Sequence, residues 1–503
     1  MAATNDLMQP NPVLAEDQNL KRVLGPVHLT MLGIGAVIGA GIFVITGQVA
    51  ASYAGPAVLV SFIVAGLGCL FAGLCYAEFA SMIPVSGSAY TYAYATMGRF
   101  MAWFIGWNLV LEYLVSSSTV AVGWSGYFTE LMKFLHINFP DALTNAPLCV
   151  IGDPPPCPHM GPITGHGFDA FIHQFGYTGA IMNAPGALLV LLLTAVLVVG
   201  MRESANTNAL MVGVKLLVVL LVVFFGLGHI DWNNFTPFVP ANTGAFGHFG
   251  WSGVLTGSAI IFFAYIGFDS VSVAAQETRN PQRDLPLGIL ATLFICTVLY
   301  IAMSVVLLGM AYYTTMENIP NPVSFAVGKI ENLHWLVPII DVGASVGLAS
   351  TIFVGLYGQS RIFYSMSRDG FLPKMFAIVH PRFKTPHRGT IITGIVAAIL
   401  AAVFPLNLLG QLVSIGTLLA FVVVCGGIMI LRVQAPKAKR PFRTPYVWVT
   451  APLGILFCGG MMASLPNDTW LRLIVWTAIG LVIYFAYGVW HAKASKWKVA
   501  NEA

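Results

Sequence analysis

Long apolar runs alternate with short polar segments along almost the whole 503-residue chain. A helix needs about 20 mainly apolar residues to cross the hydrocarbon core of a bilayer, and the runs reach this length again and again. The pattern predicts an all-α membrane protein with about twelve transmembrane helices. Their approximate bounds are 27–53, 57–83, 98–131, 184–201, 205–228, 251–276, 287–314, 336–367, 389–404, 406–432, 447–465 and 469–491.

The composition supports a membrane location. The chain is 57% hydrophobic and only 9% charged, whereas soluble proteins carry about a quarter charged residues. Its net charge of +4 is too small to indicate nucleic-acid binding. The first twenty or so residues are polar and lack the apolar core of a signal peptide. The seven cysteines are scattered, so the sequence predicts no zinc framework and no cofactor.

The basic residues predict the orientation of the spans. Of 24 lysines and arginines, all but four fall in the termini or in alternate loops on the N-terminal side. The exceptions are Lys133, Lys329 and Arg472 on the other side, and Lys215 inside a span. Because cytoplasmic loops are enriched in positive charge, we expect both termini to be cytoplasmic. The basic loops after spans 8 and 10 either serve this orientation alone or also bind anionic lipid headgroups.

The loop between spans 3 and 4 is the longest on the predicted outer side. It contains Cys149 and Cys157, which an oxidising compartment would allow to pair. It also holds four irregularly spaced histidines. Their spacing favours a solvated lid over a metal site.

Span 1 is unusually rich in glycine at its middle. Gly33, Gly35, Gly39 and Gly41 fall within nine residues, and each glycine costs about 1 kcal/mol in a helix relative to alanine. This cluster favours an unwound segment near Gly39-Ala40-Gly41. The alternative is close packing of helices through Gly35 and Gly39.

Span 6 shows a second candidate break. An aromatic run containing Phe262, Phe263 and Tyr265 leads to Gly267, which is followed by Phe268 and an acid. Glycine-interrupted spans in matching halves of a transporter indicate its binding site. Spans 1 and 6 are five apart, and because five is odd, two five-helix repeats would have opposite orientations in the membrane.

Two such breaks offer chemistry that suits an amino acid. A half-helix that begins near Gly41 and Ile42 presents free N–H groups to a carboxylate. Unwound carbonyls near Phe262, Phe263 and Tyr265 would accept hydrogen bonds from an ammonium group. The sequence therefore predicts an amino acid substrate.

Two isolated charges lie deep within predicted spans. Lys215 in span 5 is expected to bridge span 1 to span 8 and to couple proton movement to conformation, because a buried lysine can release its proton. The alternative is a static tether that stays charged. Glu112 in span 3 either favours a cationic substrate side chain, or hydrogen-bonds in its protonated form to neighbouring helices, or supports a broken helix. Intramembrane charges of this kind indicate function.

Three further acids are predicted nearer the ends of spans. Glu78 and Asp269 are expected to pair with Arg99 or Arg361 near the cytoplasmic side. Asp341 is expected to lie at the outer interface.

Four motifs resemble those of the amino acid–polyamine–organocation superfamily, in its cationic amino acid transporter branch and bacterial relatives. They are residues 35–43 (GAVIGAGIF), 76–90 (YAEF through PVSGSAY), 263–286 (FAYIGFD through NPQRDLP) and 361–370 (RIFYSMSRDG). The resemblance implies a five-plus-five inverted-repeat fold with two additional C-terminal helices. It also implies secondary amino acid transport across the plasma membrane, in bacteria the inner membrane, of cationic or small neutral amino acids.

The resemblance places substrate at the two breaks and a proton at Lys215, where sodium-coupled relatives hold a sodium ion. The expected substrate-binding residues are Val37, Ile38, Gly39, Ala40, Gly41, Ile42, Phe262, Phe263, Tyr265, Gly267, Phe268, Glu112, Val354 and Tyr357. Among them, Phe268 is expected to act as an aromatic gate, and Val354 and Tyr357 to set side-chain size. Amino acid exchange and sodium symport remain alternatives.

This chain departs from the family pattern at a few positions. Ala40 replaces a hydroxyl residue, and Val273 and Gln276 stand where relatives often have Thr and Glu. We expect a transport core at 25–432 and two peripheral helices at 433–491. Cytoplasmic tails are expected at 1–24 and 492–503.

Overall fold

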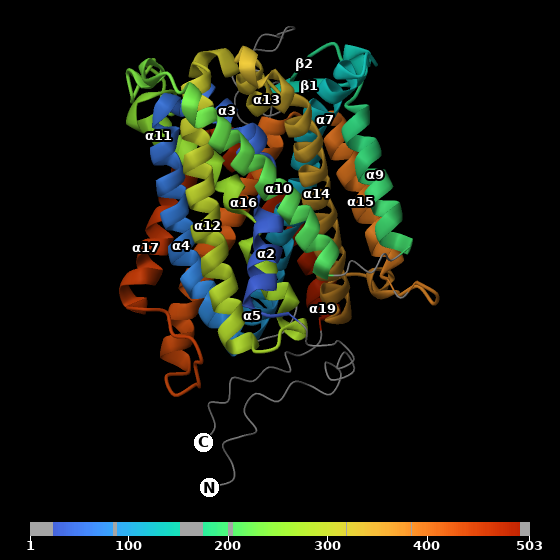
Figure 1. The fold of residues 1–503 in the computed structure, drawn as a ribbon. Helices are drawn as coiled ribbons and strands as arrows, with labels where there is room; N and C mark the ends of the chain where they lie inside the picture. The colour runs from blue at the N-terminus through green and yellow to red at the C-terminus, as the bar shows by residue number, and fades with distance from the viewer. Residues whose placement is uncertain are drawn as a thin grey trace.

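The structure is a computed structural model that describes residues 24–83, 88–150, 175–199, 205–317, 319–383 and 385–492. Its helices run side by side in one bundle (Figure 1). In the described residues the only sheet is a pair of short antiparallel strands, β1 (Leu148–Val150) and β2 (Phe175–Tyr177). The predicted all-α architecture is therefore confirmed.

Each predicted span has a helical counterpart. Span 1 consists of α2 (Pro26–Val37), a π-helical turn (Gly41–Ile45), α3 (Thr46–Val49) and a second π-helical turn (Ala50–Ala54). Spans 2 to 5 are α4 (Val58–Met82), α6 and α7 (Arg99–Val110 and Ser116–Phe134, joined by the π-helical turn Leu111–Val115), α9 (Ala184–Val199) and α10 (Ala205–Gly226).

The predicted spans in the second half of the chain also have helical counterparts. Span 6 consists of α11 (Gly250–Ile261) and two 3₁₀ segments (Phe262–Tyr265 and Phe268–Glu277). Spans 7 to 12 are α12 (Pro281–Met310), α14 (Val337–Arg368), α15 (His387–Val403), α16 (Leu406–Gln434), α17 (Val447–Ser464), and α18 with α19 (Asn467–Ile483 and Val489–His491). Two shorter helices, α5 (Ser88–Thr96) and α13 (Pro322–Gly328), lie in connections.

Length and composition support multiple membrane crossings. Among the described residues, nine helices are long and apolar enough to cross a membrane, and the continuous helix Gly41–Met82 contains parts of spans 1 and 2. Pro26–Val37, Ala184–Val199 and His387–Val403 are shorter apolar helices. Span 7 was predicted at 287–314 but begins at Pro281, because proline suits the first position of a helix.

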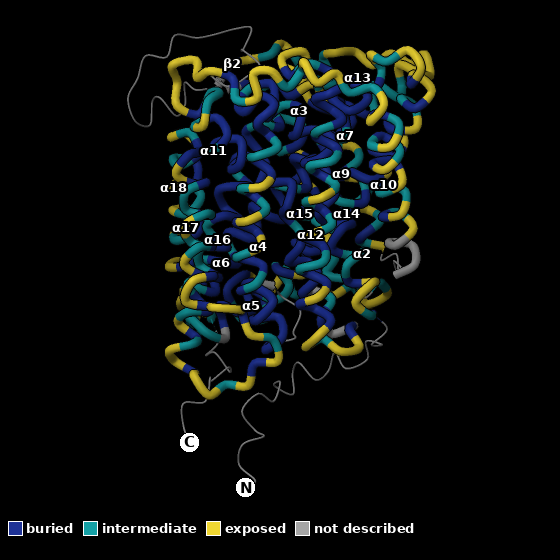
Figure 2. The backbone as a smooth tube through the Cα atoms, turned by 60° about the vertical axis from the view of Figure 1, so that its left-hand side comes forward, coloured by how far each residue is buried: buried dark blue, intermediate teal, exposed yellow. Residues whose placement is uncertain are grey.

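The exposed surface of the bundle is apolar along its length. Large side chains such as Phe224, Phe294 and Val482 are more than two-thirds exposed, whereas the inner faces of the helices are buried (Figure 2). Soluble proteins rarely expose so much apolar surface. This distribution is the one expected of a protein surrounded by lipid.

The helices fall into two groups that meet along the centre. In one group α12 packs against α2 and α4, and the Phe268–Glu277 segment packs against all three. In the other group α7 packs against α14 and α16. Of the C-terminal helices, α17 lies against both groups, through α4 and α16, whereas α18 contacts α6 and α16.

The two ends of the described chain lie at the same end of the bundle. Leu24 accepts a backbone hydrogen bond from Arg279, in the connection between spans 6 and 7. Ala492 accepts one from the Arg99 side chain at the start of span 3. In Figure 1, α5 and α19 mark this end, and α3, α13 and the strands mark the opposite end.

Candidate functional site

The helix of span 1 breaks at its glycine cluster. α2 ends at Val37, and Ile38 has φ −72° and ψ 97°, outside the helical region. The helix resumes at Gly41. A Cβ atom on Gly41 would lie 2.3 Å from the Cβ of Ala264 in span 6. Glycine at this position therefore lets the two spans approach each other at their breaks.

Span 6 breaks beside the break in span 1. Ile266 has φ −61° and ψ 135°, an extended conformation, and Gly267 has φ +112°. Only glycine adopts such a positive φ readily. A Cβ atom on Gly267 would lie 3.1 Å from both the carbonyl carbon and the Cβ of Ala36, so this break also contacts span 1.

A tyrosine of span 7 joins the two breaks. The hydroxyl of Tyr300 lies 2.7 Å from the carbonyl oxygen of Ala264 and 3.0 Å from that of Val37. Both carbonyls are at helix ends, where the regular helical hydrogen bonds stop. The sequence analysis missed Tyr300. The only indication was a hydroxyl in the middle of an apolar span, which needs a partner when buried.

Lys215 is fully buried and connects three spans. Its Nζ donates hydrogen bonds to the carbonyl oxygens of Gly35 (2.7 Å) and Ile38 (3.1 Å) and to the Thr351 hydroxyl (3.0 Å). Gly347 leaves room for the lysine stem, since a Cβ there would lie 3.0 Å from Lys215 Cγ. The predicted bridge from span 5 to spans 1 and 8 is therefore present in the structure.

The acid residues have partners other than those predicted. Asp269 accepts a 2.7 Å hydrogen bond from the Tyr113 hydroxyl and lies against Glu112. Glu78 forms ion pairs with Arg432 (2.7 Å) and Arg440 (3.0 Å). The predicted pairing of Glu78 with Arg99 or Arg361 is wrong, because the loop after span 10 folds back onto span 2.

Asp341 also differs from its prediction. It is buried rather than interfacial and accepts a hydrogen bond from Ser324 in α13. The short helix α13 covers this end of span 8, and the sequence pattern gave no indication of that cover.

Two of the predicted aromatic residues pack against Phe421 of span 10. Phe262 and Phe268 lie with ring centroids 5.5 and 5.1 Å from that of Phe421. Tyr265 points elsewhere, because its hydroxyl donates to the carbonyl of Phe62 in span 2 at 3.0 Å. Phe263 is also buried.

The two predicted residues of span 8 are not part of this cluster. Tyr357 is 37% exposed, and the Arg361 guanidinium lies 4.4 Å from its ring centroid. Val354 is half-buried on the same helix. The residue of span 8 that reaches the span 1 break is Thr351, whose hydroxyl lies 3.2 Å from the carbonyl of Ile38. The side chains of Val273 and Gln276 lie outside the described part of the structure.

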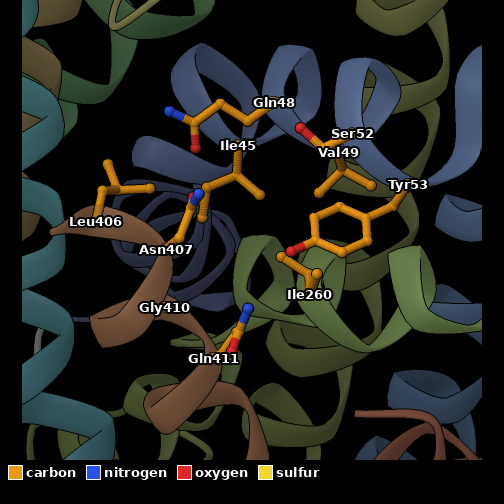
Figure 3. Close-up of a pocket in the computed structure, with 10 residues that line it drawn as sticks. All are labelled: Ile45, Gln48, Val49, Ser52, Tyr53, Ile260, Leu406, Asn407, Gly410 and Gln411. Carbon is orange, nitrogen blue, oxygen red and sulfur yellow. The ribbon is translucent and has the colours of Figure 1, made fainter. Parts of the chain in front are cut away.

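A pocket of mixed polar and apolar lining adjoins the two breaks toward the end marked by α3. It is lined by Ile45, Gln48, Val49, Ser52, Tyr53, Ile260, Leu406, Asn407, Gly410 and Gln411. Figure 3 shows that these side chains come from spans 1, 6 and 10 and surround one space. Ile45 and Ile260 lie within one helical turn of Ile42 and Phe262. The amide side chains of this pocket were not predicted.

Two family-like motifs meet at the other end of the bundle. The Tyr90 hydroxyl in α5 donates a 2.7 Å hydrogen bond to Asp369, just after span 8. Burial and the neighbouring Asp369 carboxylate raise the pKa of Tyr90 above its ordinary value. The tyrosine therefore keeps its proton and remains a hydrogen-bond donor.

The predicted outer cysteine Cys149 is disulfide-bonded, and Cys157 lies outside the described residues.

Several known proteins are similar in sequence to this chain over most of its length. The amino acid permease family matches residues 24–487. A methylthioribose transporter of Bacillus subtilis is 43% identical over 96% of both chains. The branched-chain amino acid permease BcaP of the same organism is 42% identical over 95% of this chain and 96% of its own. A vacuolar cationic amino acid transporter of Arabidopsis thaliana is 36% identical over 83% of this chain and 64% of its own. The chain therefore belongs to the amino acid permease family, within the superfamily that its motifs indicated.

Proposed function

We propose that this protein is a secondary active transporter that couples amino acid uptake to protons by alternating access. The observation that carries the proposal is the position of Lys215 at the carbonyls of Gly35 and Ile38. A charged ammonium there makes strong hydrogen bonds that hold the end of α2 in place. Loss of the proton would weaken those bonds and free α2 to move.

The same contacts favour protons over sodium. A sodium ion at the span 1 break would need several oxygen ligands. The ammonium of Lys215 already takes the Gly35 and Ile38 carbonyls and the Thr351 hydroxyl. We therefore rank sodium symport and obligatory exchange as alternatives.

The substrate site of this proposal is formed by the two breaks. Gly39, Ala40, Gly41 and Ile42 would bind the carboxylate, with Val37 and Ile38 beside them. Phe262, Phe263, Tyr265 and Gly267 would bind the amino group through backbone carbonyls. The contact between Gly41 and Ala264 supports this arrangement, because it brings the two segments together. The pocket in Figure 3 would be the approach to the site.

The surrounding side chains favour an apolar substrate side chain. Ile42, Phe262, Phe268 and Phe421 are all buried around the breaks. One similar protein is named for branched-chain amino acids, which agrees with such surroundings. The acid Glu112 would suit a cationic side chain, and a 36% identical protein is named for cationic amino acids. Methylthioribose is a second candidate, because a 43% identical relative is named for it.

The proposed location is the plasma membrane of a bacterial cell, with both termini in the cytoplasm. The distribution of lysine and arginine supports this orientation, and the basic loops after spans 8 and 10 would face anionic lipid headgroups. The proposed transport core is 25–432, with peripheral helices at 433–491 and tails at 1–24 and 492–503.

Counterflow in proteoliposomes tests the substrate assignment. Vesicles would be loaded in turn with leucine, isoleucine, alanine, arginine, lysine or methylthioribose, and exchange for labelled substrate would be measured. We expect exchange with leucine, isoleucine and alanine. If only arginine and lysine exchange, and Glu112→Gln abolishes that exchange, the substrate is cationic. Exchange with methylthioribose alone would contradict amino acid transport.

A further inference from the structure

Two buried acid side chains from different spans lie side by side just beyond the span 6 break. Glu112 is in the π-helical turn of span 3 and is 3% exposed. Asp269, two residues after Gly267, is 1% exposed. Their side chains interact directly, and the hydroxyl of Tyr113 donates to Asp269 at 2.7 Å. The acids therefore form one cluster rather than two separate sites.

Glu112 has an oxygen that the protein does not satisfy. Its Oε1 is buried and, within the part of the chain that the structure describes, has no hydrogen-bond partner. A charged carboxylate there would lose its hydration without compensation. Two adjacent carboxyl groups also resist ionising together, because each charge opposes the other. A proton between them removes both costs.

The titratable groups facing the pair are tyrosines. Tyr113 lies next to both acids, Tyr76 from α4 lies next to Tyr113, and Tyr92 from α5 faces Asp269. A tyrosine hydroxyl can donate a hydrogen bond, as Tyr113 does to Asp269, but it supplies no positive charge. Basic groups on the neighbouring elements have other contacts: Arg432 with Glu78, Arg361 with Tyr357, Arg99 with Ala492, and Lys215 with spans 1 and 8.

We propose that Glu112 and Asp269 share one proton and form a second proton-binding site, separate from Lys215. In this site the hydroxyl of one carboxylic acid donates to the carboxylate of the other. The pair then carries a single negative charge, and Tyr113 stabilises that charge.

The pair connects the two helix groups of the fold. The segment that carries Asp269 packs against α2, α4 and α12, whereas the turn that carries Glu112 packs against α14 and α16. If the two groups separate at the end of the bundle marked by α5, the carboxyl groups move apart and gain water. The shared proton would then pass to that water. This role in transport rests on the proposed function, but the shared proton does not.

Infrared difference spectroscopy of the purified protein tests for the shared proton. At neutral pH we expect the wild type to show the carbonyl stretch of a protonated carboxyl group, and the double variant Glu112→Gln/Asp269→Asn to lose it. Glu130→Gln is the matched control, because Glu130 is an exposed acid on the same span. Both it and Lys215→Gln should retain the band. Identical spectra for the wild type and the double variant would overturn the proposal.

A chemical measurement on the wild type does not depend on whether the variants fold. Hydrophobic carbodiimides react with protonated carboxyl groups inside membranes. We expect peptide mass spectrometry to find the adduct on Glu112 or Asp269 at neutral pH, and not on Glu130. Labelling of neither residue would contradict the shared proton. Failure of proton-driven uptake with positive labelling would instead count against the proposed function alone.

Discussion

Gly41 is the residue at which the broken segments of spans 1 and 6 come into contact. An added Cβ would lie 2.3 Å from Ala264 Cβ and 2.4 Å from its Cα. The Ala264 Cα belongs to the backbone, so relief of the clash requires the span 6 break to move. Ile38, Ala40 and Phe262, beside this contact, are fully buried and leave little space for such movement.

Gly41→Ala should therefore impair both stability and transport. Overpacking of this kind costs about 1–3 kcal/mol, and we expect a lower thermal unfolding temperature together with reduced counterflow. Gly459→Ala is the matched control, since no atom lies within 4 Å of its added Cβ. That variant should be as stable as the wild type or slightly more so. Equal effects of the two substitutions would show that the breaks do not pack as described.

Lys215 is the single side chain on which the proposed coupling of transport to protons depends. Its ammonium contacts carbonyls on both sides of Val37, the last residue of α2. Arginine would not replace it, because guanidinium is planar and keeps its proton at all relevant pH values. The proposed coupling therefore requires lysine in particular.

At the scale of the elements, the break in span 6 depends on backbone conformation as well as on space. Gly267 has φ +112°, and its nearest neighbours belong to Ala36 of α2. Two costs would therefore add up in a substitution at this position: a strained backbone and a contact with span 1.

Gly267→Ala can be compared with Gly98→Ala to separate these costs. Gly98 also has a positive φ, +87°, but no atom lies within 4 Å of its added Cβ. Strain at such a φ costs about 1–3 kcal/mol, and both variants should lose stability by that order. Only Gly267→Ala should also lose transport in the counterflow assay. Loss of transport in Gly98→Ala to the same degree would remove the argument for a specific contact with span 1.

A second element-scale feature is the attachment of the loop after span 10 to span 2. Glu78 is fully buried and pairs with Arg432 and Arg440, and it accepts a 2.8 Å hydrogen bond from the backbone N–H of Thr444. Arg440 in turn donates to the carbonyl of Ala435, just after α16. Removal of Glu78 leaves the buried Arg440 charge and the partly exposed Arg432 charge without their acid partner.

Glu78→Gln should therefore destabilise the protein by about 3–5 kcal/mol, as is typical when one member of a buried ion pair is lost. Glu130→Gln removes an exposed pair with Lys133 at 3.5 Å, and such surface pairs contribute about 0–1 kcal/mol. Thermal unfolding in detergent provides the comparison. If Glu78→Gln unfolds at the same temperature as Glu130→Gln, the loop is held by other contacts.

At the scale of the whole molecule, the apolar pattern predicted the fold well. The observed helices lie close to the predicted spans because the bilayer requires a nearly fixed apolar length. Gly39-Ala40-Gly41 and Gly267 predicted where spans 1 and 6 leave the helical conformation, since glycine is costly inside a helix.

The side-chain pairings of the site were harder to predict. Glu78 and Arg432 are 354 residues apart in the chain, and Tyr300 reaches Val37 across 263 residues. Local patterns contain no information about such contacts, which depend on how the helices pack. The expected role of Tyr357 near the substrate stays a prediction, and its side chain is 37% exposed.

If substrate movement carries protons by way of Lys215, transport must produce a proton flux that can be measured. Proteoliposomes containing a pH-sensitive dye would receive an inward gradient of the amino acid identified by counterflow, with no sodium present. Proton coupling through Lys215 predicts acidification of the lumen with the wild type and with Lys133→Gln, an exposed lysine control. It predicts no acidification with Lys215→Gln. Proton coupling through Lys215 would be contradicted by any of three results. These are substrate entry without acidification in the wild type, entry that requires sodium, and full acidification with Lys215→Gln.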